Sequence, residues 1–104
     1  MSLLSTAVTT ASTAAAIYTS SGATALTVLC FCNRHTSTEY LDLFAVASGE
    51  SVTANNQILS GLPIPAGDTF MFEVVRLLFD DGDKLCANTS TVNKVTATIS
   101  YTSI

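Results

Sequence analysis

Short runs of apolar residues, each ended by a polar or glycine-containing turn, recur along the whole chain. The longest run lies between two Gly-Asp turns, and its β-branched and aromatic residues are typical of a β-strand. The pattern predicts strands at residues 13–19, 23–33, 39–47, 58–64, 69–79, 84–88 and 94–103. No segment has the helical period of about 3.6 residues. About seven or eight short strands at this spacing predict an all-β fold, either an antiparallel β-sandwich or a jelly-roll-like barrel.

Two of these predicted strands are apolar on both faces. In strand 23–33 the alternating faces are Leu26, Val28, Cys30 and Cys32 against Leu29 and Phe31. In strand 39–47 they are Tyr40, Phe44 and Val46 against Leu41, Leu43 and Ala45. A two-layer sandwich gives each strand only one side that faces the core. We therefore expect the second face to be buried between subunits, with Leu29, Phe31, Leu41 or Leu43 at the contact.

The strand predicted at 69–79 changes the parity of its apolar positions halfway along. A β-bulge near Val74 and Val75 would restore one inward face and turn Glu73 and Arg76 outward. The reversals between strands carry glycine where a turn needs a positive φ angle. These turn glycines are Gly22, Gly67 and Gly82.

The first twelve residues are rich in Thr, Ser and Ala and have only a weak apolar period. We expect residues 1–12 to form an N-terminal arm that lies extended on this or a neighbouring subunit. Residues 13–104 are predicted to form a single β-sandwich domain, because a chain of 104 residues builds one core. The first residues resemble neither a signal peptide nor a membrane anchor.

The composition favours surfaces that pack against a neighbour. Only 12% of the residues are charged, 48% are hydrophobic, and the mean hydropathy is +0.46. So few charges cover a monomer poorly, and we expect a homo-oligomer. The formal net charge of -4 argues against nucleic acid as a partner, because phosphate binding needs clustered basic side chains.

Candidate catalytic and metal-binding groups are few. Cys30, Cys32 and Cys86 are expected to be reduced, buried small hydrophobes, with a disulfide at Cys86 or a metal site as the alternatives. The single histidine, His35, is assigned to a solvated loop, the alternative being a ligand or base. The acidic turn 80–83 has carboxylates for calcium but lacks the spacing of an EF-hand loop. We expect no enzyme activity, no cofactor and no resident metal.

Two charges interrupt otherwise apolar strands. Asp42 lies on the face of Tyr40 and Phe44, and Arg76 lies among apolar neighbours. Each either reaches solvent at a strand edge or pairs with the other, within or between subunits, because an unpaired buried charge is costly. Both are therefore candidate interface residues.

Several short motifs resemble those of small β-sandwich structural proteins of tailed-bacteriophage virions. They cover most of the chain from residue 16 to its end, and they mark turns and strands rather than catalytic groups. The motifs are Ala-Ile-Tyr-Thr-x-x-Gly-x-x-Ala at 16–25, Cys-Asn at 32–33, Leu-Pro-Ile-Pro-Ala-Gly-Asp-Thr at 62–69, Gly-Asp at 82–83 and Val-x-Ala-x-Ile-Ser-Tyr at 95–101.

The resemblance implies a virion protein without enzyme activity that is assembled in the host cytoplasm. Its implied role is capsid decoration as a cement protein, with other virion proteins such as the major capsid protein as partners. It also favours a trimer, because decoration proteins of this kind often occupy threefold positions. The alternatives are a neck, tail or fibre component and a receptor- or sugar-binding tip domain. Neither nucleic acid nor a membrane is an expected partner.

Overall fold

The computed structural model describes residues 2–8 and 14–104, with side chains described for all of these except 2, 7 and 72–76. Within these residues it contains eight strands and one short 3-10 helix. They are β1 Ser2–Ala7, β2 Ala15–Thr19, β3 Thr24–Asn33, β4 Glu39–Val46, η1 Ala54–Asn56, β5 Gln57–Ile64, β6 Thr69–Phe79, β7 Lys84–Thr89 and β8 Val95–Ser103. The seven predicted strands are confirmed, with every end within two residues of its predicted place. No helix of the described part is long and apolar enough to cross a membrane.

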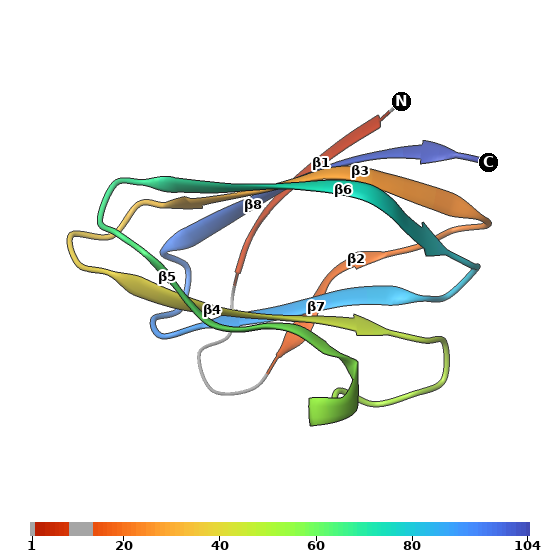
Figure 1. The fold of residues 1–104 in the computed structure, drawn as a ribbon, viewed down its shortest axis with the longest axis horizontal. Helices are drawn as coiled ribbons and strands as arrows, with labels where there is room; N and C mark the ends of the chain where they lie inside the picture. Colours follow the sequence, from red (N-terminus) through yellow and green to blue (C-terminus); the bar gives the residue numbers. More distant parts are fainter. Residues whose placement is uncertain (1, 9–13) are drawn as a thin grey trace.

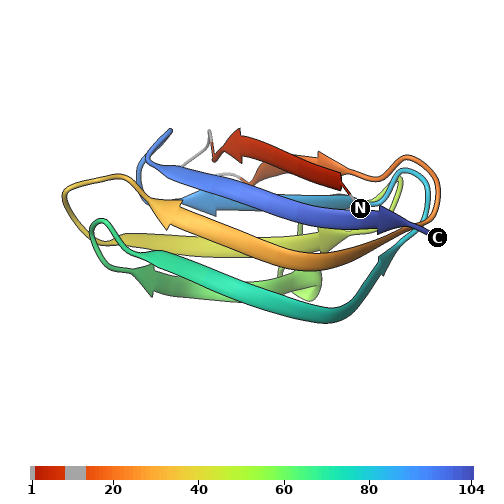
Figure 2. The same ribbon diagram turned by 90° about the horizontal axis from the view of Figure 1, so that it is seen from above.

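The strands form two antiparallel sheets that pack face to face (Figure 1). Sheet A has the strand order β1-β8-β3-β6, and sheet B has the order β2-β7-β4-β5. Seen from above, β1 and β6 are the two outer strands of sheet A (Figure 2). The predicted all-β antiparallel sandwich is thereby confirmed.

The pairing of the strands follows that of one long hairpin wound into two sheets. The pairs β1–β8, β2–β7, β3–β6 and β4–β5 are nested antiparallel ladders, and β3–β8 and β4–β7 complete the sheets. This nesting of eight strands in two four-stranded sheets is the arrangement of a jelly roll. The sequence pattern does not predict this pairing, because partner strands such as β1 and β8 lie at opposite ends of the chain.

The main core lies between the two sheets. It is built from large apolar side chains of both layers, with Val8 just beyond β1 among them. Its most deeply buried large members are Phe31, Leu26, Leu29, Leu41, Leu43, Ile64, Leu85 and Ile99. Two buried polar side chains, Glu39 and Asn33, lie at one end of this core and are satisfied by hydrogen bonds.

Two bulges decide which side chains face this core. Between Leu26 and Val28, β3 carries one residue more than β8, so the inward parity changes at Thr27. Opposite the same point, β6 carries extra residues between Glu73 and Leu77. The bulge predicted near Val74 and Val75 is therefore present in the backbone; the predicted outward turn of the Glu73 and Arg76 side chains lies outside the described residues.

The first strand belongs to the sandwich of its own chain. β1 pairs with β8 over its whole length, from Ser2 opposite Tyr101 to Ala7 opposite Thr96. Val8 is fully buried, and its N–H donates to the Val95 carbonyl oxygen at 2.8 Å. Of the residues predicted to form an arm, residues 2–8 thus lie on this subunit, and residues 1 and 9–12 lie outside the described residues.

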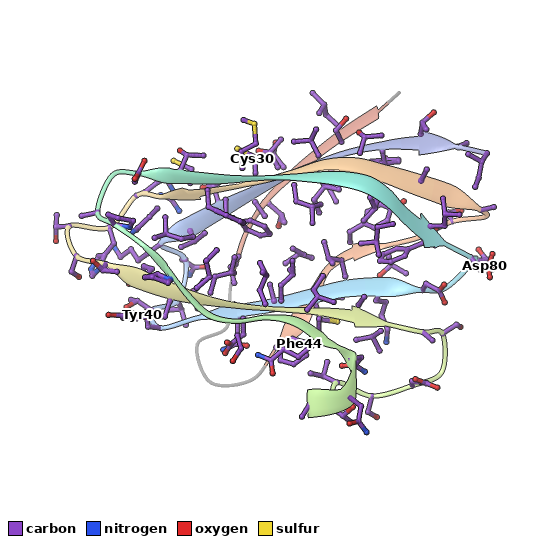
Figure 3. All side chains as sticks on the ribbon, in the orientation of Figure 1. Cys30, Tyr40, Phe44 and Asp80 are labelled. Carbon is purple, nitrogen blue, oxygen red and sulfur yellow. The ribbon has the colours of Figure 1, made fainter. Side chains whose placement is uncertain are left out.

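A second, smaller apolar cluster covers part of the outer face of sheet B. Phe44 and Val46 of β4 and Cys86 of β7 are buried there beneath Ala14 and Val52. Phe44 points away from the space between the sheets (Figure 3). The connection between β4 and β5 holds this cover in place, because Thr53 and Asn56 form a capping box at η1.

Candidate functional site

The four apolar residues predicted at a subunit contact lie in the main core. Leu29, Phe31, Leu41 and Leu43 each have a relative exposure of 0%. This corrects the assignment made from the sequence, because a side chain without exposed surface cannot touch another subunit. The bulge at Thr27 turns Leu29 and Phe31 inward. Leu41 and Leu43 lie on the core side of β4, and Phe44 and Val46 on its other side are covered by residues of their own chain.

The outer face of sheet A is the open surface of this molecule. Its side chains lie in rows across the strands: Leu3, Ser100 and Val28; then Ser5, Thr98, Cys30 and Met71; then Thr96, Cys32 and Thr69. Figure 3 shows Cys30 pointing outward from this sheet. The side chains named here are uncharged, and β1, β3 and β8 contain no charged residue. Two charged residues border them. Arg34, directly after β3, donates to the Thr96 hydroxyl at 2.8 Å, and the register places Glu73 of β6, whose side chain lies outside the described residues, opposite Val28.

The cysteines divide between two environments. Cys86 is buried in the smaller cluster, whereas Cys30 and Cys32 are half-buried on the outer face of sheet A. This corrects the expectation that all three are core residues. All three are free thiols. Burial raises the pKa of the Cys86 thiol, and the nearby positive charge of Lys84 offsets part of that rise.

Asp42 organises the edge strand β5. One carboxylate oxygen accepts hydrogen bonds from the Gly61 N–H at 2.7 Å and the Gln57 amide at 3.3 Å. The other accepts from the Asn88 amide at 3.2 Å. Among the described side chains, the donors to this carboxylate are all neutral. The side chain of Arg76 lies outside the described residues, so its pairing with Asp42 stays a prediction.

The loop after β3 brings together the groups most similar to a catalytic arrangement. His35 Nδ1 lies 2.8 Å from the Ser37 hydroxyl and 3.2 Å from Glu39 Oε2. In a Ser-His-acid triad the serine and the acid bind opposite nitrogens of the ring, so that a proton can pass between them. Here both groups meet the same nitrogen, and this cluster is not arranged as a triad.

Glu39 is a buried carboxylate that the sequence did not single out as a candidate site residue. It is almost fully buried, and its Oε1 accepts hydrogen bonds from the Thr91 N–H at 2.7 Å and the Ser90 hydroxyl at 3.1 Å. Together with the His35 contact, these bonds tie the β3–β4 loop to the β7–β8 loop. The available signal was its position at the first residue of an inward-facing apolar run.

The acidic turn at the other end of the molecule uses its carboxylates as turn acceptors (Figure 3). Asp81 accepts from the Gly22 N–H at 2.8 Å, and Asp83 accepts from the Ser48 and Asp80 N–H groups at 2.9 Å each. The described residues contain no group of three or more His, Cys, Asp or Glu side chains arranged for a metal ion. The turn therefore joins three connections of the sandwich.

The turn glycines have the conformations that their turns require. Gly22, Gly67 and Gly82 have φ angles of +74°, +72° and +86°. Gly82 also lies against another connection: a Cβ added there would meet Ser48 Oγ at 2.6 Å. These residues are structural, because each closes a reversal between strands.

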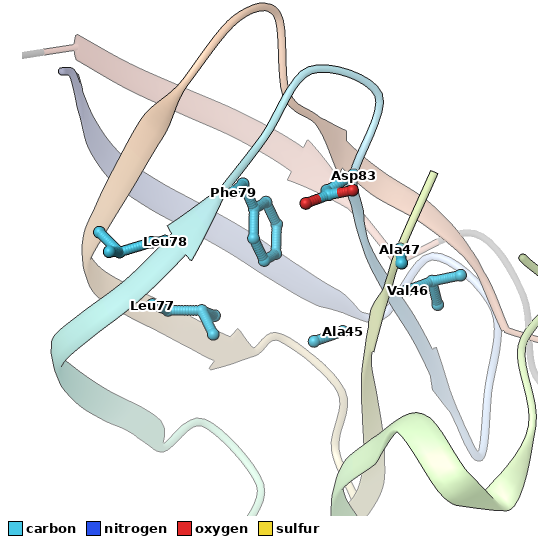
Figure 4. Close-up of a pocket in the computed structure, with 7 residues that line it drawn as sticks. All are labelled: Ala45, Val46, Ala47, Leu77, Leu78, Phe79 and Asp83. Carbon is cyan, nitrogen blue, oxygen red and sulfur yellow. The ribbon is translucent and has the colours of Figure 1, made fainter. Parts of the chain in front are cut away.

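One cavity of about 200 Å³ opens between the ends of β4 and β6 (Figure 4). Ala45, Val46 and Ala47 line one side, and Leu77, Leu78 and Phe79 line the other, with Asp83 at the rim. Binding sites for small molecules usually enclose about 300–1,000 Å³ and place several polar groups around the ligand. The cavity is smaller than that and is mainly apolar, so it does not define a small-molecule site.

Comparisons with known proteins assign no family to this chain. No model of a known protein family matches the sequence, and no curated protein matches it either. The functional argument therefore rests on the surfaces described above.

Proposed function

We propose that this chain is a structural protein of a tailed-phage virion, and that it decorates the capsid as a cement protein. It acts without catalysis by laying the outer face of sheet A on the major capsid protein. Its place is the virion, assembled in the host cytoplasm. The observation that carries this proposal is the open outer face of sheet A, where the three neighbouring strands β1, β8 and β3 contain no charged residue, beside a partly covered sheet B.

The chemistry of that face suits protein contact. Val28, Met71 and the half-buried Cys30 supply apolar surface, and the threonine hydroxyls of β8 can exchange hydrogen bonds with a partner. Interface cores are depleted of charge in the same way, whereas surfaces that stay in water are not. An exposed face of this apolar and hydroxyl-rich kind is therefore better explained by a partner than by solvent.

The jelly-roll topology and the motif resemblance support the same role. Double-sheet jelly rolls occur in viral capsid domains, but also in lectins and cupins. The fold alone does not distinguish among these functions, so the proposal depends on the chemistry of the outer face. The trimer that the resemblance favours remains an expectation about symmetry.

The proposal is tested by counting copies and then by altering the docking face. Quantitative mass spectrometry of purified virions should find hundreds of copies per particle. A few to a few dozen copies would assign the chain to the neck, tail or fibre instead. Its absence from the particle would reject a virion role.

A matched pair of lysine variants tests the face itself. Thr98→Lys places a charge in the centre of the outer face, and Ser51→Lys adds the same charge to the exposed β4–β5 connection. Added to particles stripped of this protein, Thr98→Lys should fail to rebind at concentrations where Ser51→Lys rebinds fully. Equal rebinding of both would show that the capsid contact lies elsewhere.

A tip domain that binds a receptor or a sugar is the second candidate, and one observation favours it. Tyr40 is 52% exposed near the start of β4, directly opposite Pro63, and an exposed aromatic residue offers a surface for stacking (Figure 3). Loss of binding to host cells on Tyr40→Ala, together with a low copy number, would establish this function over decoration.

A further inference from the structure

The four edge strands of the sandwich differ in their protection against pairing with another strand. An unpaired sheet edge offers a row of free N–H and C=O groups, and proteins usually blunt it with bulges, proline or charge. β2 is bulged between Ala16 and Tyr18. β5 has two register shifts and contains Pro63. β6 is bulged and carries both Glu73 and Arg76.

β1 has none of these devices. It is the terminal strand of sheet A, and its ladder with β8 runs from Ser2 to Ala7 without a register shift. It contains neither proline nor a charged residue. Leu3, which is 72% exposed, is the most exposed large apolar side chain of the described residues. Figure 2 shows β1 along one side of the sheet, where the described part of the chain provides no further strand.

The backbone direction of β1 shows which groups this edge offers. The Val8 N–H donates toward β8, to the Val95 carbonyl oxygen. In an antiparallel ladder, successive residues turn their N–H and C=O groups alternately toward and away from the partner. Leu3, Ser5 and Ala7 therefore turn theirs toward the free edge.

We propose that the free edge of β1 pairs with β1 of a second copy of this chain, antiparallel and centred on Ser5. In this register Ser5 lies opposite the partner's Ser5, and Leu3 lies opposite the partner's Ala7. The odd-numbered residues then form hydrogen-bonded pairs throughout. A twofold contact of this kind is self-complementary, because each copy supplies the same donors and acceptors.

A second copy fits this edge better than a strand of a different protein, because charge and geometry both permit self-pairing. The chain has a net charge of -4, yet β1, β8 and β3 contribute none of it, so the pairing brings no like charges into contact. The two copies of sheet A become one sheet of eight strands. Because opposite residues of antiparallel strands lie on the same face, the two outer faces join into one surface, widened from about 19 Å to about 38 Å at the usual strand spacing.

This inference goes beyond the capsid role and predicts a dimer in place of the trimer that the resemblance favours. It is tested with the purified 104-residue chain alone. Sedimentation equilibrium from micromolar to millimolar concentration should show the mass rising from 10.9 kDa toward twice that value. Ser5→Glu and Ser5→Lys should each dissociate several-fold more readily, since like charges then lie directly opposite each other. At low salt an equimolar mixture of the two should associate about tenfold more tightly than either alone.

Two controls separate edge pairing from other contacts. Ser5→Ala keeps the outward N–H and should associate like the unmodified chain. Thr98→Glu and Thr98→Lys place the same charges one strand further in, where no opposite partner residue lies, so neither should weaken association to the same extent and their mixture should gain nothing.

Four results would overturn the proposal. These are a mass that stays at one chain up to millimolar concentration, a mass of three chains, Ser5 variants that associate normally, and an equal loss from the Thr98 variants. The last would indicate that two copies stack their outer faces instead. Ser5 and Thr98 lie on the outer face, so we expect every variant to keep the fold. Circular dichroism and thermal unfolding of each variant check this.

Discussion

The turn at Gly82 depends on the absence of a side chain for two separate reasons. Its φ of +86° strains any β-branched residue, and an added Cβ would meet both the Oγ and the Cβ of Ser48, at 2.6 and 3.1 Å. Gly82→Val should therefore lower the free energy of unfolding by about 1–3 kcal/mol or more. Urea unfolding followed by circular dichroism measures the loss.

Gly67→Val is the matched control for this prediction. Gly67 has a similar φ of +72°, but nothing lies within 4 Å of the position its Cβ would take. The Gly82 variant should therefore lose more stability than the Gly67 variant. Equal losses would mean that Ser48 moves aside at no cost, and no loss in either would contradict the turn conformations.

The three cysteines should react with a thiol reagent in two classes. Cys30 and Cys32 are half-buried on an outer face, whereas Cys86 is buried with a pKa raised by its loss of solvation, so less of it is thiolate. In the native protein two thiols should label readily and the third only after denaturation. Cys86→Ala should leave the native labelling count at two; three equally fast thiols would contradict this placement.

The sequence predicted the positions of the strands better than it predicted which side chains enter the core. Leu29 and Phe31 alternate correctly with Cys30, but a single extra residue at Thr27 transfers them to the opposite face. Such a bulge is fixed by pairing with two neighbouring strands, and β3 by itself carries no sign of it. In 69–79 the parity change occurs within the strand, which is why that bulge was predictable.

At the scale of the element, β5 shows how an edge strand is held in an irregular shape. Its bulge brings the Gly61 N–H to Asp42, which also binds Gln57 and Asn88. Asp42→Ala leaves these donors without an acceptor and should lower the free energy of unfolding by about 1–3 kcal/mol. Chemical denaturation of the Asp42→Ala variant and the unmodified chain measures this loss of stability.

Asp68→Ala is the control for the Asp42 variant, since it removes the same charge. Among the described residues, the Asp68 carboxylate accepts only from the adjacent Thr69 N–H in an exposed turn, and the backbone bond that closes this turn remains. Its cost should stay below about 0.5 kcal/mol. Equal costs for the two variants would show that net charge, and not the bulge anchor, sets the stability.

β1 and the connection over Phe44 show what element patterns leave undetermined. Residues 2–7 are ordered by β8, which lies almost a whole chain length away in sequence, so their local pattern is weak although they form a strand. Phe44 and Val46 made β4 look apolar on both faces because the cover over them comes from a loop. Strand positions follow from local chemistry, but partners and covers depend on distant segments.

In the molecule as a whole, the nested strand pairs differ in the number of residues that lie between the two paired strands. Leu43 pairs with Leu59, 16 positions away, whereas Leu4 pairs with Ile99, 95 positions away. Closing the longer loop first costs about 1.6 kcal/mol more in chain entropy. Folding should therefore begin around the β4–β5 hairpin and end with β8 and β1, on the millisecond-to-second scale of all-β domains.

Two core variants of equal burial test this order. Leu43 and Ile99 both have 0% exposure, and truncating either to alanine should destabilise the protein by about 2–5 kcal/mol. Because contacts formed early affect the folding rate and those formed late affect the unfolding rate, Leu43→Ala should mainly slow folding, while Ile99→Ala should mainly speed unfolding. Stopped-flow folding and unfolding rates across a range of urea concentrations separate the two effects. The opposite assignment would mean that the chain ends meet first and that the inner hairpin forms on a sheet already built.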